Sequence, residues 1–161
     1  MISALKTTIL IAIIYTAIIF TIYPVQGFVA NHIDYTIHNN GDATVTADYE
    51  MSIGEKIALM VPGIKDQFIN VIKSEYGENA KVSSLSDSHA QFTIPDYGLV
   101  TETYVQSPYI SFENLKTRAN GYWFMKYLDI DYSPTITTIT FDNGKVITYN
   151  DVTVIPATSN I

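Results

Sequence analysis

Two stretches of this chain alternate apolar and polar residues on both sides of a turn that ends in glycine, and this pattern constrains the fold most. The first is IDYTIHNNGDATVTADYEM, residues 33–51, and the second is TITTITFDNGKVITYNDVTVIP, residues 135–156. Such alternation is typical of strands with one buried face, and a glycine-containing turn between two of them indicates a hairpin. Each stretch therefore predicts a β-hairpin.

The turns fix the register of both hairpins. A three-residue loop over residues 39–41 keeps apolar residues opposite one another and places Gly41 at the left-handed position that such loops require. A two-residue loop at Asn40-Gly41 would set apolar residues opposite polar ones. The same reasoning applies to a loop over residues 142–144. The expected cross-strand partners are Ile37 with Ala43, Tyr35 with Val45, Ile139 with Ile147 and Thr137 with Tyr149.

The segment after the first hairpin contains helix signals. Ser52 and Glu55 have the spacing of a capping box, in which each residue satisfies a free helix donor of the other. Gly77 is suited to end a helix. We therefore predict a helix over residues 53–76, kinked at Pro62-Gly63. Its expected core-facing stripe comprises Ile57, Val61, Ile64, Phe68, Ile72 and Tyr76.

The middle of the chain predicts further strands and a second helix. Residues 80–94 alternate around a polar turn and predict two short strands closed by Pro95. Residues 100–106 predict another strand, which ends before Pro108, and residues 112–120 have helical spacing. The order of elements predicts an α+β fold, with an antiparallel β-sheet built from hairpins and two helices packed on one face.

The first 27 residues are expected to carry a targeting signal. Residues 7–23 are almost continuously apolar, and Asp, Glu, Lys and Arg do not occur from residue 7 to residue 33. A helix of this length spans about 26 Å, the short end of what crosses a bilayer core. We expect residues 1–27 to be a signal-anchor or signal peptide and residues 28–161 to be one extracytoplasmic α+β domain.

Retention and cleavage of this segment predict the same topology. Lys6 and the amino terminus are the only positive charges before the apolar run, so the domain after Gly27 is expected outside the cytoplasmic membrane. Retention gives a single-pass membrane protein. Cleavage after Val25-Gln26-Gly27, which resembles a leader-peptidase site, gives a secreted protein. A buried core helix is a third alternative, although the segment lacks a polar stripe. The expected membrane-anchor residues are Ile9, Ile13, Ile14, Ile18 and Phe20.

Composition and motifs argue against several functional classes. The net charge is −7, and the few Lys and Arg residues are scattered, so nucleic-acid binding is not expected. The chain has no Cys, which removes disulfides, thiolate metal sites and a Cys nucleophile. It also contains no G-x-S-x-G, H-E-x-x-H or glycine-rich phosphate loop. We expect no enzymatic activity and no cofactor; a hydrolase with dispersed carboxylates is the minor alternative.

The histidines and clustered aspartates do not predict a metal site. His32 and His38 share the polar face of one strand but lie ~20 Å apart, too far for one ion. His89 is expected in a turn. Carboxylates that could bind calcium occur at Asp129, Asp131 and Asp142. Calcium loops need more carboxylates and glycine in a tighter pattern, so turn chemistry is the favoured interpretation.

The densest aromatic stretch is NGYWFMKYLDIDYSP, residues 120–134. Aromatic clusters bind sugars and carry interface energy, although an aromatic run in a domain of this size is more often core. Tyrosines near Pro95 and Pro108, namely Tyr97, Tyr104 and Tyr109, would extend the patch if it is exposed. The candidate binding residues are Tyr122, Trp123, Phe124, Tyr127 and Tyr132.

The signal-anchor, the opening hairpin DYTIHNNGDATVTADYEMS, the GYWFMKYLDIDYSP stretch and the closing FDNGKVITY together resemble small archaeal cell-envelope proteins of uncharacterised function. The likeness covers most of the chain, rests on structural motifs and carries over no site residues. The expected function is a non-enzymatic domain, tethered to the lipid bilayer by the N-terminal helix, that contacts other envelope proteins or itself. The alternative is a secreted module that binds carbohydrate or another small ligand at the Trp123 patch.

Overall fold

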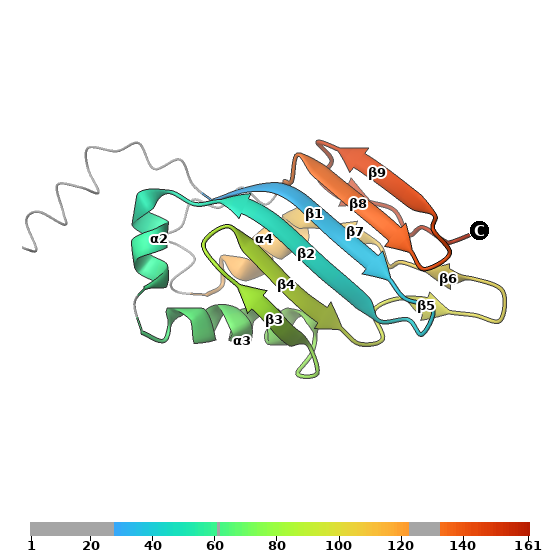
Figure 1. Ribbon diagram of the computed structural model, residues 1–161, viewed down its shortest axis with the longest axis horizontal. Helices are drawn as coiled ribbons and strands as arrows, with labels where there is room; N and C mark the ends of the chain where they lie inside the picture. Colours follow the sequence, from blue (N-terminus) through green and yellow to red (C-terminus); the bar gives the residue numbers. More distant parts are fainter. Residues whose placement is uncertain (1–27, 61, 123–132) are drawn as a thin grey trace, which may run out of the picture.

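A six-stranded sheet forms the framework of the protein (Figure 1). The computed structural model describes residues 28–60, 62–122 and 133–161. In chain order the elements are β1 (Val29–Ile37), β2 (Ala43–Glu50), α2 (Ile53–Leu59), α3 (Ile64–Tyr76), β3 (Lys81–Leu85), β4 (His89–Ile94), β5 (Leu99–Val100), β6 (Val105–Gln106), β7 (Ile110–Ser111), α4 (Phe112–Ala119), β8 (Ile136–Phe141), β9 (Val146–Asn150) and β10 (Val154–Ile155). The predicted α+β class is confirmed.

Both hairpins have the predicted register. Ile37 lies opposite Ala43 and Tyr35 opposite Val45 in the first hairpin, β1–β2. In the second, β8–β9, Ile139 faces Ile147 and Thr137 faces Tyr149. The loop glycines Gly41 and Gly144 have φ angles of 89° and 87°, the left-handed conformation that three-residue loops require.

The expectation of a purely antiparallel sheet is wrong at one position. The strand order is β3-β4-β2-β1-β8-β9, and β8 runs parallel to β1 while the other neighbours are antiparallel. Parallel strands need a long crossover connection. The chain between β4 and β8 includes β5, β6, β7 and α4, and it returns to the end of the sheet where β1 begins. The two hairpins are thereby joined through their first strands, with Tyr35 beside Ile139.

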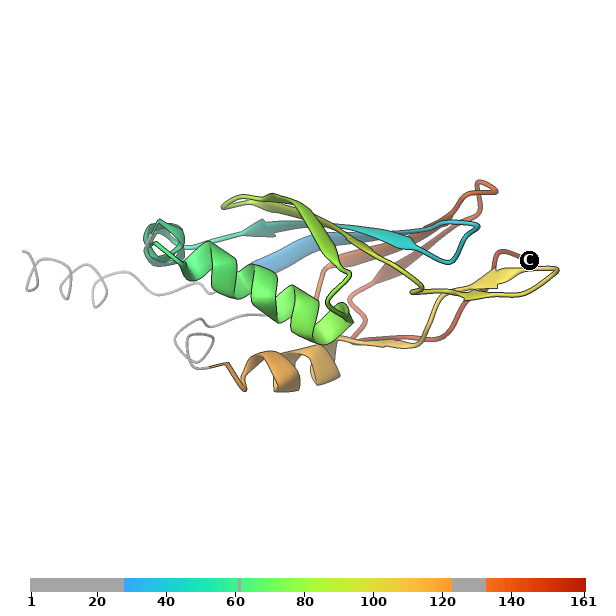
Figure 2. The same ribbon diagram turned by 90° about the horizontal axis from the view of Figure 1, so that it is seen from below.

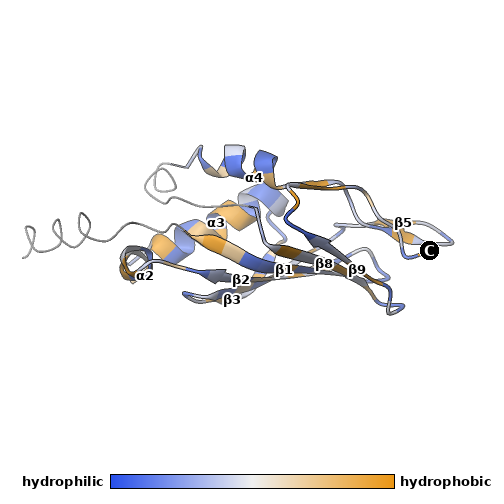
Figure 3. Ribbon diagram, turned by 90° about the horizontal axis from the view of Figure 1, so that it is seen from above, coloured by the Kyte–Doolittle hydropathy of each residue, from blue (hydrophilic) through white to orange (hydrophobic). Residues whose placement is uncertain are grey.

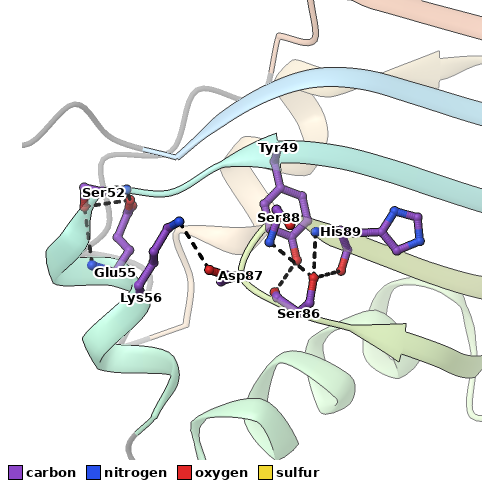
Figure 4. Close-up of polar contacts among 8 residues, drawn as sticks. All are labelled: Tyr49, Ser52, Glu55, Lys56, Ser86, Asp87, Ser88 and His89. Carbon is purple, nitrogen blue, oxygen red and sulfur yellow. Dashed lines mark hydrogen bonds and ion pairs between the residues drawn. The ribbon is translucent and has the colours of Figure 1, made fainter.

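The capping box begins α2 as predicted, but the helix does not continue through Pro62. Glu55 N donates to Ser52 Oγ at 3.3 Å, and Ser52 N donates to Glu55 Oε2 at 2.8 Å (Figure 4). The predicted kinked helix is instead two helices, α2 and α3, because Gly63 adopts a left-handed φ of 88° between them. Gly77 ends α3, and its N–H donates to the carbonyl of Lys73.

Both longer helices lie on the same face of the sheet (Figures 2 and 3). Beneath them a core forms from alternate residues of the central strands and from Val105, Ile110, Phe112 and Ile155, which follow in the crossover and the C-terminal segment. Ile72 and Tyr76 of α3 pack against this core, and Phe68 joins a second, smaller cluster. Ile57 of the predicted stripe is 47% exposed, so its assignment to the core is wrong.

Residues 100–106 do not form one strand. Leu99–Val100 and Val105–Gln106 pair as a short hairpin, because Thr101 Oγ1 accepts bonds from the backbone of Thr103 and Tyr104 and closes a turn. Ile110 and Ser111 pair with the C-terminal strand β10, which the sequence did not predict. Within the described ranges, no helix is both long enough and apolar enough to cross a bilayer.

Candidate binding groove

A groove of about 480 Å³ opens where the C-terminal end of α3, the end of β4 and the start of α4 meet. We call it the Tyr-Pro groove. Its wall includes two tyrosine and proline pairs that are adjacent or nearly adjacent in the sequence, and a charged pair that joins the two helices. The residues that define it here are Glu75, Pro95, Tyr97, Pro108, Tyr109 and Arg118.

Local backbone chemistry places the first tyrosine. Pro95 has no N–H and therefore ends β4. Asp96 follows with a left-handed φ of 52°, and its N–H donates to Asp42 Oδ1 at 3.1 Å. This bend turns the ring of Tyr97 onto the inner face of the sheet, where it stacks on Tyr35 with ring centroids 5.9 Å apart.

The second tyrosine is presented to solvent by the segment before α4. Tyr109 follows Pro108 and is 60% exposed. Two residues later, Ser111 caps α4, because its Oγ accepts a bond from the backbone N–H of Asn114 at 3.2 Å. The cap and the β7–β10 pairing hold this wall of the groove in place.

The two helices contribute the charges of the groove. Arg118 Nη1 of α4 donates to Glu75 Oε2 of α3 at 3.1 Å. The Glu75 side chain is only 15% exposed, whereas that of Arg118 is 63% exposed. The carboxylate therefore stays in the wall, and the guanidinium edge is available to a bound ligand.

A rigid aromatic layer lies behind the groove. Tyr76 packs edge-on against Tyr97 and tilted against Phe92. Burial raises the pKa of Tyr76 to about 12, and it also raises the pKa values of Tyr35 and Tyr97. Deeper still, an apolar cavity of about 110 Å³ shares Tyr76 and Leu115 with the groove. An apolar ring or short alkyl group could thus lie against tyrosine faces while polar groups meet Arg118.

Of the predicted aromatic patch, the structure describes only Tyr122, which does not line the groove. Tyr122 is half-buried and packs with Phe28, Phe68 and Val71 beside Ala119. Trp123, Phe124, Tyr127 and Tyr132 lie outside the described residues, as do the anchor residues Ile9, Ile13, Ile14, Ile18 and Phe20 and the candidate calcium ligands Asp129 and Asp131. Of the three tyrosines expected to extend the patch, Tyr97 and Tyr109 line the groove and Tyr104 does not. The sequence feature that could have predicted the groove is a proline one or two residues before a tyrosine, as in Pro108-Tyr109 and Pro95-Asp96-Tyr97.

The three histidines lie on the face of the sheet opposite the helices, and each is paired with an aspartate. His32 Nε2 is 3.1 Å from Asp34, and His38 Nδ1 is 3.0 Å from Asp142. His89 is not a turn residue as predicted: it begins β4 opposite Asp48, and its Nδ1 lies 2.8 Å from that carboxylate. Asp142 is in its predicted turn, where the N–H of Asn39 and then His38 lower the pKa of its carboxyl. In the part of the chain that the structure describes, no group of three such side chains could hold a metal ion.

A third surface feature lies at the end of the molecule where the N-terminal segment joins. Ile53 (61%) and Ile57 (47%) of α2, and Met60 (80%) directly after it, are exposed and follow one another at helical spacing. We call these residues the α2 apolar patch. On the opposite side of α2, Glu55 is buried and its Oε1 accepts a bond from the N–H of Phe28 at 3.0 Å.

One further contact joins α2 to the sheet: Lys56 Nζ lies 3.2 Å from Asp87 Oδ2 in the β3–β4 turn (Figure 4). This turn is bonded to β2, because Tyr49 donates to the carbonyl of Ser86 at 2.8 Å. Burial raises the pKa of Tyr49 to about 12, with a smaller effect from Asp87. The patch is thus held in a defined position, on the face of α2 that points away from the Glu55–Phe28 bond.

Comparison with protein-family models, curated proteins and solved structures gives no match for this chain. The function is therefore inferred from the residues and the geometry described above.

Proposed function

We propose that this protein is a non-enzymatic domain held at the outer face of the cytoplasmic membrane by an N-terminal transmembrane helix, where it binds another envelope component or assembles with itself. The observation that carries the proposal is the α2 apolar patch, which lies on the exposed side of a helix whose buried side bonds Phe28. Phe28 follows the apolar segment after only four residues, 24–27. Five residue steps reach at most ~18 Å, so a membrane-embedded segment would keep α2 close to the bilayer surface.

The exposed side chains fit that position. Isolated apolar residues on a surface are common. Two on one face of a helix and a third directly after it, close to the end of an apolar segment, suit contact with acyl chains. The bond between Phe28 and Glu55 ties α2 to the residue that follows the apolar segment, which keeps the patch within reach of a bilayer that holds this segment. Burial of each apolar side chain contributes roughly 25 cal/mol per Å².

The absence of Cys from the chain makes the proposal directly testable. Full-length Ile57→Cys protein would carry an environment-sensitive fluorophore in phosphatidylcholine vesicles that contain a spin-labelled lipid as quencher. Thr103→Cys is the matched control, because Thr103 is exposed in the β5–β6 turn, at the end of the molecule opposite α2 (Figure 1). We expect the spin-labelled lipid to quench the fluorophore at position 57 but not at position 103. Equal quenching at both positions would contradict membrane contact by α2.

An intact-mass measurement tests the tether itself. Protein extracted from its native membrane fraction is expected at the full 18.0 kDa of the chain. A mass lacking residues 1–27 would mean that the domain is secreted and would leave the alternative function below.

The second candidate function is carbohydrate or small-ligand binding, and the Tyr-Pro groove favours it. Sugars stack an apolar ring face on an aromatic side chain and bond their hydroxyls to charged groups. In the groove, Tyr109 offers an aromatic ring for stacking. Arg118, paired with Glu75, offers a charged group for bonds to hydroxyls. The sequence predicted this function for the patch around Trp123, which lies outside the described residues.

Calorimetric titration of the protein with a panel of envelope oligosaccharides would test this candidate. Tyr109→Ala is expected to weaken binding at least tenfold. Tyr104→Ala is the matched control, because Tyr104 lies in the neighbouring hairpin and does not line the groove. Binding that is equally affected by both substitutions, or absent from the unmodified protein, would rule the groove out as a sugar site.

A further inference from the structure

The two edges of the main sheet differ in how they are protected against pairing with another strand. At one edge, β3 begins with Lys81 and has a bulge between Val82 and Ser84. Charges and bulges are the usual devices that prevent edge-to-edge association. At the other edge, β9 has the sequence VITYN, with no charge, proline or glycine, and it pairs with β8 without a register shift. The β9 edge is thus regular and unprotected.

The hydrogen-bond pattern shows which backbone groups of β9 point outward. At one end of the strand Phe141 N donates to the carbonyl of Lys145, and at the other Asp151 N donates to that of Thr135. In an antiparallel pair, alternate residues bond the neighbouring strand. Ile147 and Tyr149 therefore bond β8, which leaves the N–H and C=O groups of Val146, Thr148 and Asn150 directed away from the sheet.

These three residues are also the exposed ones. Val146 is 57% exposed, and Thr148 and Asn150 are likewise exposed. Among the described residues, no strand pairs with this edge of the sheet.

We propose that the β9 edge binds the β9 edge of a second copy of this chain, in antiparallel orientation about a two-fold axis at Thr148. Thr148 would then lie opposite Thr148 of the second copy, and Val146 opposite Asn150. All of these residues direct their backbone groups outward, so the register satisfies the edge donors and acceptors of both strands.

The residues that flank β9 support this register. With Thr148 at the centre, Lys145 of one copy lies beside Asp151 of the other, and Ile147 beside Tyr149. Lys145 Nζ donates to the backbone oxygens of Ser159 and Ile161, which holds its ammonium group near the strand. Centring the pair on Val146 or Asn150 would separate the opposite charges and shorten the paired segment. The sequence around Thr148 is therefore complementary to itself in both charge and hydrogen bonding.

The membrane tether would make so small an interface effective. Two five-residue strands bury far less than the ~1,200 Å² typical of stable complexes, so the contact is weak between freely diffusing molecules. Here the inference rests on the proposed function, because two copies held on one bilayer face have a raised effective concentration. The two-fold axis is perpendicular to the strands, so the two α2 apolar patches lie at opposite ends of the dimer (Figure 1). Both patches would face one bilayer if the strands run along its surface and the axis is parallel to the membrane normal.

Single-cysteine cross-linking in native membranes tests the register. Full-length Thr148→Cys protein is expected to form a covalent dimer with an ethane-bridged bis-thiosulfonate, because the two Cα atoms of a hydrogen-bonded pair are ~5.5 Å apart. Val146→Cys protein is the matched control, since its copies would be offset by four residues, ~14 Å. A mixture of Val146→Cys and Asn150→Cys proteins is expected to cross-link again.

Equal cross-linking of all single variants would indicate random collision and overturn the proposal. Cross-linking of Thr148→Cys protein to a different polypeptide would overturn it in favour of strand addition by another envelope protein. As a second variant, Thr148→Pro removes an outward N–H and leaves the bonds to β8 intact. It is expected to abolish the amine-cross-linked dimer of the otherwise unmodified chain without changing the circular dichroism spectrum; a dimer that persists would contradict the β9 interface.

Failure of the β9 interface and failure of the N-terminal membrane tether would give different results. Full-length protein in the membrane that yields no Thr148→Cys dimer would refute the β9 interface alone. Loss of residues 1–27 together with Thr148→Cys dimers in concentrated solution would refute the tether alone.

Discussion

Gly41 and Gly144 occupy the same position in two hairpin loops of equal length, yet their surroundings differ. Both have a left-handed φ, which costs a residue with a Cβ atom roughly 1–2 kcal/mol. A Cβ on Gly41 would lie 2.9 Å from Val100 Cγ2 and 3.0 Å from the carbonyl oxygen of Gly98, whereas one on Gly144 would meet nothing within 4 Å. The first loop therefore needs glycine for two reasons and the second for one.

We expect Gly41→Ala to lower the free energy of unfolding by at least ~2 kcal/mol and Gly144→Ala by about 1 kcal/mol. Urea unfolding of the full-length protein in detergent, followed by circular dichroism, measures both. Equal losses would mean that the segment around Gly98 moves aside at no cost.

Thr137 is a second residue whose surroundings predict a measurable effect. Its side chain is fully buried in β8, and its hydroxyl has no hydrogen-bond partner among the described residues. A buried hydroxyl without a partner costs roughly 1–3 kcal/mol, and valine has nearly the same shape. Thr137→Val is therefore expected to raise the free energy of unfolding by about 1 kcal/mol in the same assay. A destabilised variant would indicate that the hydroxyl is bonded in solution.

At the scale of elements, the two helices on the sheet are packed to different depths. No residue of α3 is fully buried, whereas Phe112 at the start of α4 is 2% exposed and belongs to the main core. Phe68 of α3 packs in the smaller cluster with Phe28, Val71 and Tyr122. Thus α4 is anchored in the core through its first residue, Phe112, whereas α3 packs against the sheet only through half-buried side chains.

Matched truncations would measure this difference. Phe112→Ala is expected to cost ~3–5 kcal/mol, because it leaves a cavity in the main core. Phe68→Ala should cost about 1–2 kcal/mol, because part of the ring already contacts solvent. Similar losses in the two variants would mean that α3 is packed as tightly as α4.

At the scale of the whole molecule, buried tyrosines make stability depend on alkaline pH. The pKa values of Tyr35, Tyr49, Tyr76 and Tyr97 are all raised above 10, chiefly by burial. Folding favours their neutral form, so the stability that they contribute is complete below pH 10 and falls as the pH rises toward and beyond 12.

An absorbance titration at 295 nm is therefore expected to show tyrosine ionisation above pH 11 that coincides with loss of the native circular dichroism spectrum. A single midpoint near pH 10 with the fold intact would mean that the tyrosine layer behind the groove is open to solvent.

Features that depend on neighbours a few residues apart could be predicted from the sequence. The hairpin registers at Gly41 and Gly144, the capping box of Ser52 and Glu55, and the end of α3 at Gly77 all follow from short-range sterics and hydrogen bonds. The pattern at Pro62-Gly63 predicts a kink in one helix, whereas the structure has two separate helices. Proline and glycine together stop a helix that either residue alone could only bend.

The tertiary structure decided which of these pieces meet. The parallel pairing of β1 with β8 depends on where a long crossover returns, and no local pattern encodes that. The Tyr-Pro groove likewise joins residues from α3, the end of β4 and the start of α4, so its members become neighbours only when the core has formed. Alternation and turn chemistry act over a few residues and are written in the sequence. The pairing of distant segments is set by how their buried faces fill one common interior.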